Sequence, residues 1–174
     1  MTTGNGTKPR AAWIGLGANL PSRIGGPKET LAAARARIEE LPDTRVTAVS
    51  SLYESAPVDA GGPPFINQVL RVESTLPALS LLEGLQAIEL AFGRERPFRN
   101  APRTLDLDLL LMAGETRTDT VLKLPHPRLH ERLFVLMPLA EIDADLHVPG
   151  LGTAATLLTQ LLATEHGQDC RRLV

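Results

Sequence analysis

Two aspartates stand two residues apart in an otherwise strongly apolar stretch, residues 104–112. Successive side chains of a strand point to opposite faces, so Asp106 and Asp108 would project together while the neighbouring leucines point into a core. Two carboxylates held about 6–7 Å apart repel each other, and their burial removes hydration. A nearby cation offsets both costs. Mg²⁺ bound together with a phosphate is the commonest remedy. The pattern therefore favours a magnesium site, with a solvated sheet face as the alternative.

Four arginines lie directly before this strand, at positions 94, 96, 99 and 103. Guanidinium groups match phosphate oxygens in geometry and keep their charge at all physiological pH values. On its own, such a loop is better explained as a solvated, charged surface. Beside the two aspartates it predicts a polyphosphate site, because arginines and a metal ion would neutralise a nucleotide from two sides.

Other common catalytic motifs are missing or incomplete. Lys28 is not followed by Ser or Thr, so there is no Walker A loop, and Leu20 stands where a dinucleotide fingerprint needs its third glycine. His126 and His130 are four residues apart, a spacing that could place two zinc ligands on one helix face. Pro127 disfavours a helix there, so we expect His126 to contact phosphate or to be structural.

The elements that must position these side chains alternate between strands and helices. Strands are expected over 11–17, 45–53, 65–73, 104–112 and 121–124, and helices over 29–41, 77–93 and 153–163. This order predicts an α+β fold with a mainly antiparallel sheet and helices on one of its faces. Residues 55–64 hold three prolines and two glycines and predict a long loop of the kind that carries function. We expect residues 1–10 to be a flexible tail and 11–174 to be a single domain.

Composition excludes several classes of protein. The 174 residues include 18 basic and 20 acidic side chains, a net charge of -2 that argues against nucleic-acid and membrane-surface binding. Aromatic residues make up 3% of the chain, too few for a surface that stacks bases. The single cysteine, Cys170, cannot form an internal disulfide, and it lies near a C-terminus that we expect to be frayed. We expect a monomeric, cytoplasmic protein without a membrane span.

Several of these residues belong to motifs that are similar to those of the 6-hydroxymethyl-7,8-dihydropterin pyrophosphokinase family. The resemblance extends over about residues 13–149, and the block that ends at Asp108 is its most specific part. The motifs are Gly-Leu-Gly-Ala-Asn at 15–19, Ser-Leu-Tyr-Glu-Ser at 51–55, Phe-Ile-Asn at 65–67, Gly-Arg at 93–94, Pro-Arg-Thr-Leu-Asp-Leu-Asp at 102–108, Pro-His at 125–126 and Glu-Arg-Leu-Phe at 131–134.

The resemblance implies a ferredoxin-like α+β fold and a transfer reaction in folate biosynthesis. The terminal diphosphate of ATP would pass to the pterin hydroxymethyl oxygen, with release of AMP. Asp106 and Asp108 would bind two Mg²⁺ ions, and Arg94 and Arg103 would stabilise the transferring group. Asp106, with a metal ion, could also help to remove the proton of the acceptor hydroxyl.

The same resemblance assigns the substrate contacts. The residues implied to contact ATP are Gln86, Glu89, His126 and Arg132. Those implied to bind the pterin are the sandwiching rings Phe65 and Phe134, Asn67 at its polar edge, and backbone groups between Ser55 and Val58.

Two positions depart from the family pattern, and two rival functions remain. Asn100 stands where some members have a tryptophan that closes over the pterin, and Pro127 stands where others have an aromatic residue. One alternative is a Mg²⁺-dependent nucleotide phosphohydrolase that uses the same aspartates with water as acceptor. The other is an RNA-binding ferredoxin-like module, for which the chain lacks the aromatic residues and the positive charge.

Overall fold

A six-stranded sheet forms the centre of the computed structural model, which describes residues 7–57, 61–93, 103–165 and 167–174. The strands lie in the order β10-β3-β4-β1-β5, and β2 pairs with β4 beside β3; the neighbouring strands are all antiparallel. Their bounds are β1 Arg10–Ala18, β2 Thr44–Val49, β3 Tyr53–Ser55, β4 Phe65–Ser74, β5 Asp106–Met112 and β10 Cys170–Arg172. Two small hairpins are formed by β6 (Arg117–Thr118) with β7 (Lys123–Leu124), and by β8 (His147–Val148) with β9 (Gly152–Thr153).

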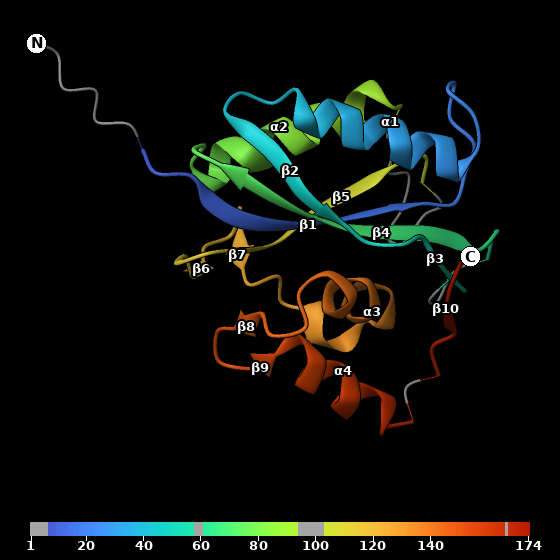
Figure 1. Ribbon diagram of the computed structural model, residues 1–174. Helices are drawn as coiled ribbons and strands as arrows, with labels where there is room; N and C mark the ends of the chain where they lie inside the picture. The colour runs from blue at the N-terminus through green and yellow to red at the C-terminus, as the bar shows by residue number, and fades with distance from the viewer. Residues whose placement is uncertain (1–6, 58–60, 94–102, 166) are drawn as a thin grey trace, which may run out of the picture.

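Helices cover both faces of the sheet, which corrects the expectation that they share one face. In Figure 1, α1 (Pro27–Glu39) and α2 (Ala78–Ala91) lie above the sheet. Below it lie α3 (Leu133–Ile142), preceded by the short 3₁₀-helix η1 (Leu129–Glu131), and α4 (Ala154–Leu162). In the part of the chain that the structure describes, no helix is long and apolar enough to cross a membrane.

The second helical layer follows from the apolar side chains on both faces of the sheet. On one face, Ile14, Leu16 and Leu107 are buried against α1 and α2. On the other face, Trp13 and Val69 are buried in a second core together with residues of α3 and α4. Each buried aliphatic side chain contributes about 1.5–3 kcal/mol by leaving water, so neither face could stay exposed. The α+β fold with a mainly antiparallel sheet is confirmed.

The predicted strand 45–53 is divided into β2 and β3 by Ser50. The backbone N–H of Ser50 donates to Val69, but the Ser50 hydroxyl, and not its carbonyl, accepts the N–H of Val69 at 3.0 Å. The Ser50 carbonyl instead accepts a bond from the amide of Gln68 at 2.9 Å. A side chain thus takes the place of a ladder carbonyl, and the chain continues as a separate strand, β3.

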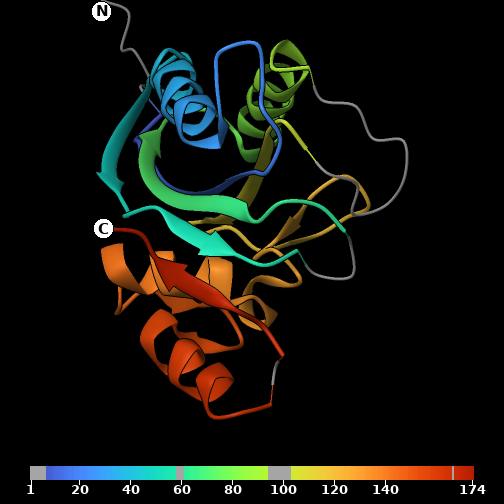
Figure 2. The same cartoon turned by 90° about the vertical axis from the view of Figure 1, so that its right-hand side faces the viewer.

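The C-terminus is ordered, whereas the sequence analysis predicted a frayed end. Residues 170–172 form β10, which lies alongside β3 (Figure 2) and places Cys170 opposite Ser55. An ion pair between Arg171 and Glu54 spans the two strands at 2.6 Å. The pairing covers an edge that β3 would otherwise expose.

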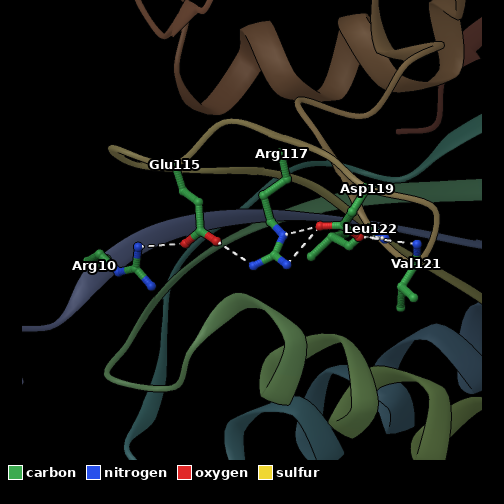
Figure 3. Close-up of polar contacts among 6 residues, drawn as sticks. All are labelled: Arg10, Glu115, Arg117, Asp119, Val121 and Leu122. Carbon is green, nitrogen blue, oxygen red and sulfur yellow. Dashed lines mark hydrogen bonds and ion pairs between the residues drawn. The ribbon is translucent and has the colours of Figure 1, made fainter.

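A chain of ion pairs joins the start of β1 to the turn and the hairpin that follow β5. Arg10 contacts Glu115 at 2.7 Å, and Glu115 contacts Arg117 at 3.1 Å (Figure 3). Arg117 also pairs with Asp119 at 2.8 Å, whose other carboxylate oxygen accepts two backbone N–H groups of the next turn. The register of β5 follows from its buried leucines, because a slip of one residue would turn every side chain of the strand to the other face.

Candidate active site

Three strands bring an amide, a glycine and a carboxylate into one row on the sheet face that α3 covers. Asn67 on β4 is paired with Gly17 on β1, and Gly17 is paired with Asp106 on β5. Paired residues of neighbouring antiparallel strands share a face of the sheet. Because strands lie about 4.8 Å apart, the backbones of Asn67 and Asp106 are separated by about 10 Å.

The floor between the amide and the carboxylates is bare backbone. A β-carbon on Gly17 would lie 3.3 Å from Oδ1 of Asn67, tighter than an ordinary contact. Gly15, which is paired with Asp108, would place its β-carbon 3.5 Å from Leu110. Gly17 therefore leaves space for a ligand that reaches from Asn67 to the aspartates, whereas the space above Gly15 is already occupied by Leu110.

The two aspartates point to this face, as the alternation predicted. Both are half-buried, whereas Leu107 between them is buried in the core against α1 and α2. Arg103 forms an ion pair with Asp106 at 2.6 Å, and the two side chains are only 17% and 20% exposed. An ion pair in such a partly desolvated environment is stronger than one in bulk water, because the effective dielectric constant is lower.

Arg132 approaches the aspartates from the start of α3. Burial lowers the pKa of its guanidinium, while the charge of Asp108 and, more weakly, that of Asp106 act in the opposite direction. The guanidinium carbon also lies 5.6 Å from the centre of the Phe134 ring, a cation–π distance. Arg132 thus lies between the carboxylates and Phe134, one of the two aromatic side chains predicted to stack on the pterin.

Glu89 holds the backbone between the two aspartates. Its side chain is 2% exposed, and its Oε1 accepts the backbone N–H of Leu107 at 2.7 Å. Gln86, three residues earlier on α2, is exposed. Their implied contacts with ATP stay predictions, and the observed bond gives Glu89 a second task, the placement of β5.

His126 is fixed close to the aspartates in its neutral form. Its backbone N–H donates to Leu110 at 2.7 Å, and its Nδ1 accepts the N–H of Arg128 at 3.1 Å. Burial lowers the pKa of His126 to about 4, and the nearby charge of Arg132 acts in the same direction. With Nδ1 an acceptor, the proton of the neutral ring lies on Nε2, which can donate to a ligand.

The residues implied for the pterin lie at the ends of β3 and β4 and at the start of α3. Phe65 and Phe134 are both half-buried. Asn67 is 4% exposed, and its amide donates to the hydroxyl of Ser55 at 2.8 Å. This bond fixes the orientation of the carboxamide, because the N–H side is turned to Ser55. Val58, Arg94 and Asn100 lie outside the described residues.

Asn19 is a residue to which the sequence analysis assigned no role. Its Oδ1 accepts the backbone N–H of Arg103 at 2.9 Å, and its Nδ2 donates to the carbonyl of Pro63 at 3.1 Å. The backbone N–H of Asn19 also donates to Arg103 at 3.1 Å. It therefore joins the end of β1 to Arg103 and to the loop before β4. Its place directly after a strand, in the Gly-Leu-Gly-Ala-Asn motif, was the only available signal.

The donor set of the site fits a magnesium ion that is shared with a substrate. Within residues 7–57, 61–93, 103–165 and 167–174, no group of three or more His, Cys, Asp or Glu side chains could hold a metal. Asp106 and Asp108 supply carboxylate oxygens only. Mg²⁺ is usually bound by one or two carboxylates, with water and phosphate oxygens completing its octahedron. The pair therefore suits Mg²⁺ that arrives with a nucleotide.

Solved structures of similar fold come from Plasmodium falciparum. Wild-type HPPK-DHPS with pteroate aligns with a TM-score of 0.67 over 88% of this chain, at 14% sequence identity. A triple mutant of the same protein with pteroate aligns with a TM-score of 0.69 over 90% of this chain, at 13% identity. The present chain spans less than half of these solved chains, 42% and 44%. At such low identity the likeness concerns the fold alone, and it agrees with a ferredoxin-like type.

Sequence comparisons identify the family. Curated relatives named 2-amino-4-hydroxy-6-hydroxymethyldihydropteridine pyrophosphokinase include one from Pseudomonas aeruginosa, 45% identical over 79% of this chain and 83% of its own length. The relative of that name from Haemophilus influenzae is 40% identical over 86% of this chain and 91% of its own length. The family model for 7,8-dihydro-6-hydroxymethylpterin-pyrophosphokinase matches residues 13–144. The chain therefore belongs to the 7,8-dihydro-6-hydroxymethylpterin-pyrophosphokinase (HPPK) family.

Proposed function

We propose that this pyrophosphokinase of folate biosynthesis transfers the terminal diphosphate of ATP to the hydroxymethyl oxygen of 6-hydroxymethyl-7,8-dihydropterin. The products are AMP and the pterin diphosphate. The observation that carries the proposal is the row in which Asn67 and Asp106 face each other across Gly17. This spacing of about 10 Å suits a bicyclic ring with its hydroxymethyl arm directed at the carboxylates.

The pterin binds at the Asn67 end of the row. Phe65 and Phe134 stack on its two faces, and aromatic stacking of this kind contributes beyond the area buried. Asn67 recognises the polar edge of the ring, and backbone groups between Ser55 and Val58 add hydrogen bonds. The bond between Asn67 and Ser55 supports this assignment because a carboxamide that is already oriented binds a planar edge at little entropic cost.

ATP binds at the Asp106 end, where positive charge gathers. Arg132 and the Nε2 proton of His126 contact the nucleotide, as do Gln86 and Glu89. Arg103, together with Arg94, stabilises the transferring diphosphate. The buried setting of Arg132 supports this assignment, because a guanidinium in a partly dry site attracts phosphate more strongly than one in water.

Asp106 and Asp108 hold magnesium, two ions when ATP is bound. The metal, when bound, neutralises charge on the α- and β-phosphate oxygens and so makes AMP a better leaving group. The chain supplies the positions: Glu89 and Arg103 fix β5 and the Asp106 carboxylate before any ligand arrives.

The reaction itself is a displacement at the β-phosphorus. The hydroxymethyl oxygen forms a bond to the β-phosphorus, and the bond from that phosphorus to the bridging α–β oxygen breaks, with its electron pair leaving on AMP. A carboxylate oxygen of Asp106 accepts the proton of the hydroxymethyl group. Arg103 faces the developing charge, and donors placed for developing charge typically contribute about 10²–10³ in rate.

Product analysis tests the proposed function. Purified protein is mixed with Mg²⁺, ATP and the hydroxymethylpterin, and the products are separated. AMP and pterin diphosphate in equal amounts support the transfer, whereas AMP or phosphate that forms without pterin diphosphate would indicate a phosphohydrolase. A variant Asp106→Asn with near-normal turnover would exclude the carboxylate as the proton acceptor. The monomeric state, the cytoplasmic location and the lack of a nucleic-acid partner stay predictions from the sequence.

A further inference from the structure

The C-terminal segment, residues 168–173, lies beside the site but outside the part of the chain that matches the family model, residues 13–144. Its β10 pairs with β3, the strand that carries Ser55. Figure 2 shows the segment running from α4 up to the edge of the sheet. The segment contacts two walls of the site: the start of α3, which carries Arg132 and Phe134, and the end of β3, which carries Ser55.

Gln168 at the start of this segment brackets Arg132. Its Oε1 accepts the backbone N–H of Leu133 at 2.9 Å, and its Nε2 donates to the carbonyl of Glu131 at 2.8 Å. One side-chain amide thus holds the backbone on both sides of Arg132. It does so from 35 and 37 residues further along the chain.

The start of α3 needs such a partner. Arg132 is the N-cap residue of α3, its backbone is extended, and its side chain makes no capping bond. The first N–H groups of a helix have no acceptor within the helix, and Leu133 supplies the first of them. An arginine side chain has no acceptor and cannot cap a helix, so the side-chain carbonyl of Gln168 takes the place of the missing cap.

The next residue of the segment contacts the opposite wall. The carbonyl of Asp169 accepts the backbone N–H of Ala56 at 3.2 Å, directly after Ser55. Two successive residues therefore join the wall that carries Arg132 and Phe134 to the wall that carries Ser55. These contacts come from outside the residues that match the family model, 13–144.

We propose that Gln168 is a positioning residue for substrate binding: it fixes the backbone around Arg132 and so directs the guanidinium to the nucleotide and the Phe134 ring to the pterin. The proposal rests on the proposed function for the identity of the ligands. It assigns to Gln168 no contact with substrate.

The variant Gln168→Met tests this role, because methionine has a similar length but cannot form either hydrogen bond. Three quantities are measured on the full chain: the Kd of α,β-methylene-ATP with Mg²⁺, kcat at saturating substrates, and hydrogen exchange of the Leu133 amide. We expect the Kd to rise about tenfold, or about 1.4 kcal/mol. We also expect kcat to change less than threefold and exchange to become at least tenfold faster.

The matched control is Arg171→Ala, which removes the exposed ion pair with Glu54 from the same segment and leaves Gln168 in place. It should leave both the Kd and the exchange of Leu133 unchanged. Faster exchange with an unchanged Kd in Gln168→Met would make the residue merely structural and overturn the proposal, as would no change in either. A wild-type protein that forms no pterin diphosphate would instead refute the proposed function, while nucleotide binding and exchange still test Gln168.

Discussion

A side chain at Gly17 should obstruct the ligand that the bare floor admits. In Gly17→Ala the new β-carbon would lie 3.3 Å from Oδ1 of Asn67, so the carboxamide must shift by a few tenths of an ångström. Asn67 is almost fully buried and bonded to Ser55 at 2.8 Å, so the shift weakens that bond or the one to the pterin. A hydrogen bond contributes about 0.5–1.5 kcal/mol, which predicts up to about a tenfold rise in the pterin Kd.

Gly17→Val should have a larger effect because its methyl groups would fill the floor between Asn67 and Asp106. We expect the pterin Kd to rise more than a hundredfold, about 2.8 kcal/mol. The matched control is Gly15→Ala, on the same strand and face, whose β-carbon would meet Leu110 at an ordinary 3.5 Å. Replacing a strand glycine by alanine costs no backbone stability. The Gly15→Ala control should therefore fold and bind the pterin as the wild type does.

The assay is titration calorimetry of the pterin in the presence of a non-hydrolysable ATP analogue, with thermal unfolding of each variant as the check on folding. A well-folded Gly17→Val protein that binds the pterin as tightly as the wild type would refute the reasoning. The ligand would then lie elsewhere than across the row from Asn67 to Asp106.

Three further predictions concern residues around the aspartates. Arg103→Ala removes the cation 2.6 Å from Asp106 and should lower kcat about 10²–10³-fold with little change in ATP affinity; unchanged kcat with weaker binding, measured by steady-state kinetics and calorimetry, would contradict the assigned role. Asn19→Ala leaves the backbone N–H of Arg103 without its acceptor and should lower the free energy of unfolding by about 1–3 kcal/mol in urea denaturation; an unchanged value would show that water replaces the amide. The folded pKa of His126 is about 4, below its ordinary 6.5, so the folded protein binds fewer protons than the unfolded chain between these values and loses stability as pH falls from 6.5 towards 4. This loss amounts to at most about 2 kcal/mol between pH 7 and pH 5 and should be absent in His126→Gln without nucleotide; equal losses in both proteins would refute it.

The sequence predicted those parts of the site that follow from local patterns. Leucines alternate with Asp106 and Asp108 over a single strand, and a period of two places both carboxylates on one face whatever the rest of the chain does. The proline- and glycine-rich segment 55–64 was expected to be a long loop of the kind that carries function; Ser55 still belongs to β3, and β4 begins where the segment ends.

What the sequence did not predict depends on contacts between distant segments. The residues of β10 are too few and too polar to signal a strand, and β10 exists because β3, 117 residues earlier, offers an unpaired edge. The Gln168 bracket and the bonds of Asn19 have the same origin, since a side-chain amide finds its partners only once the chain has folded. Within the second helical layer, the helix predicted over 153–163 is present as α4. The helix α3 was missed because residues 126–142, interrupted by Pro127 and Pro138, do not show a clear helical period.

The central claim is that Asp106 and Asp108 together hold the metal against the nucleotide. Crystals grown with Mn²⁺, α,β-methylene-ATP and the hydroxymethylpterin would locate the metal directly by its anomalous scattering. We predict anomalous peaks within bonding distance, about 2.0–2.2 Å, of carboxylate oxygens of both aspartates and of phosphate oxygens. Peaks that contact the phosphates alone, with the two carboxylates turned away from them, would contradict the account.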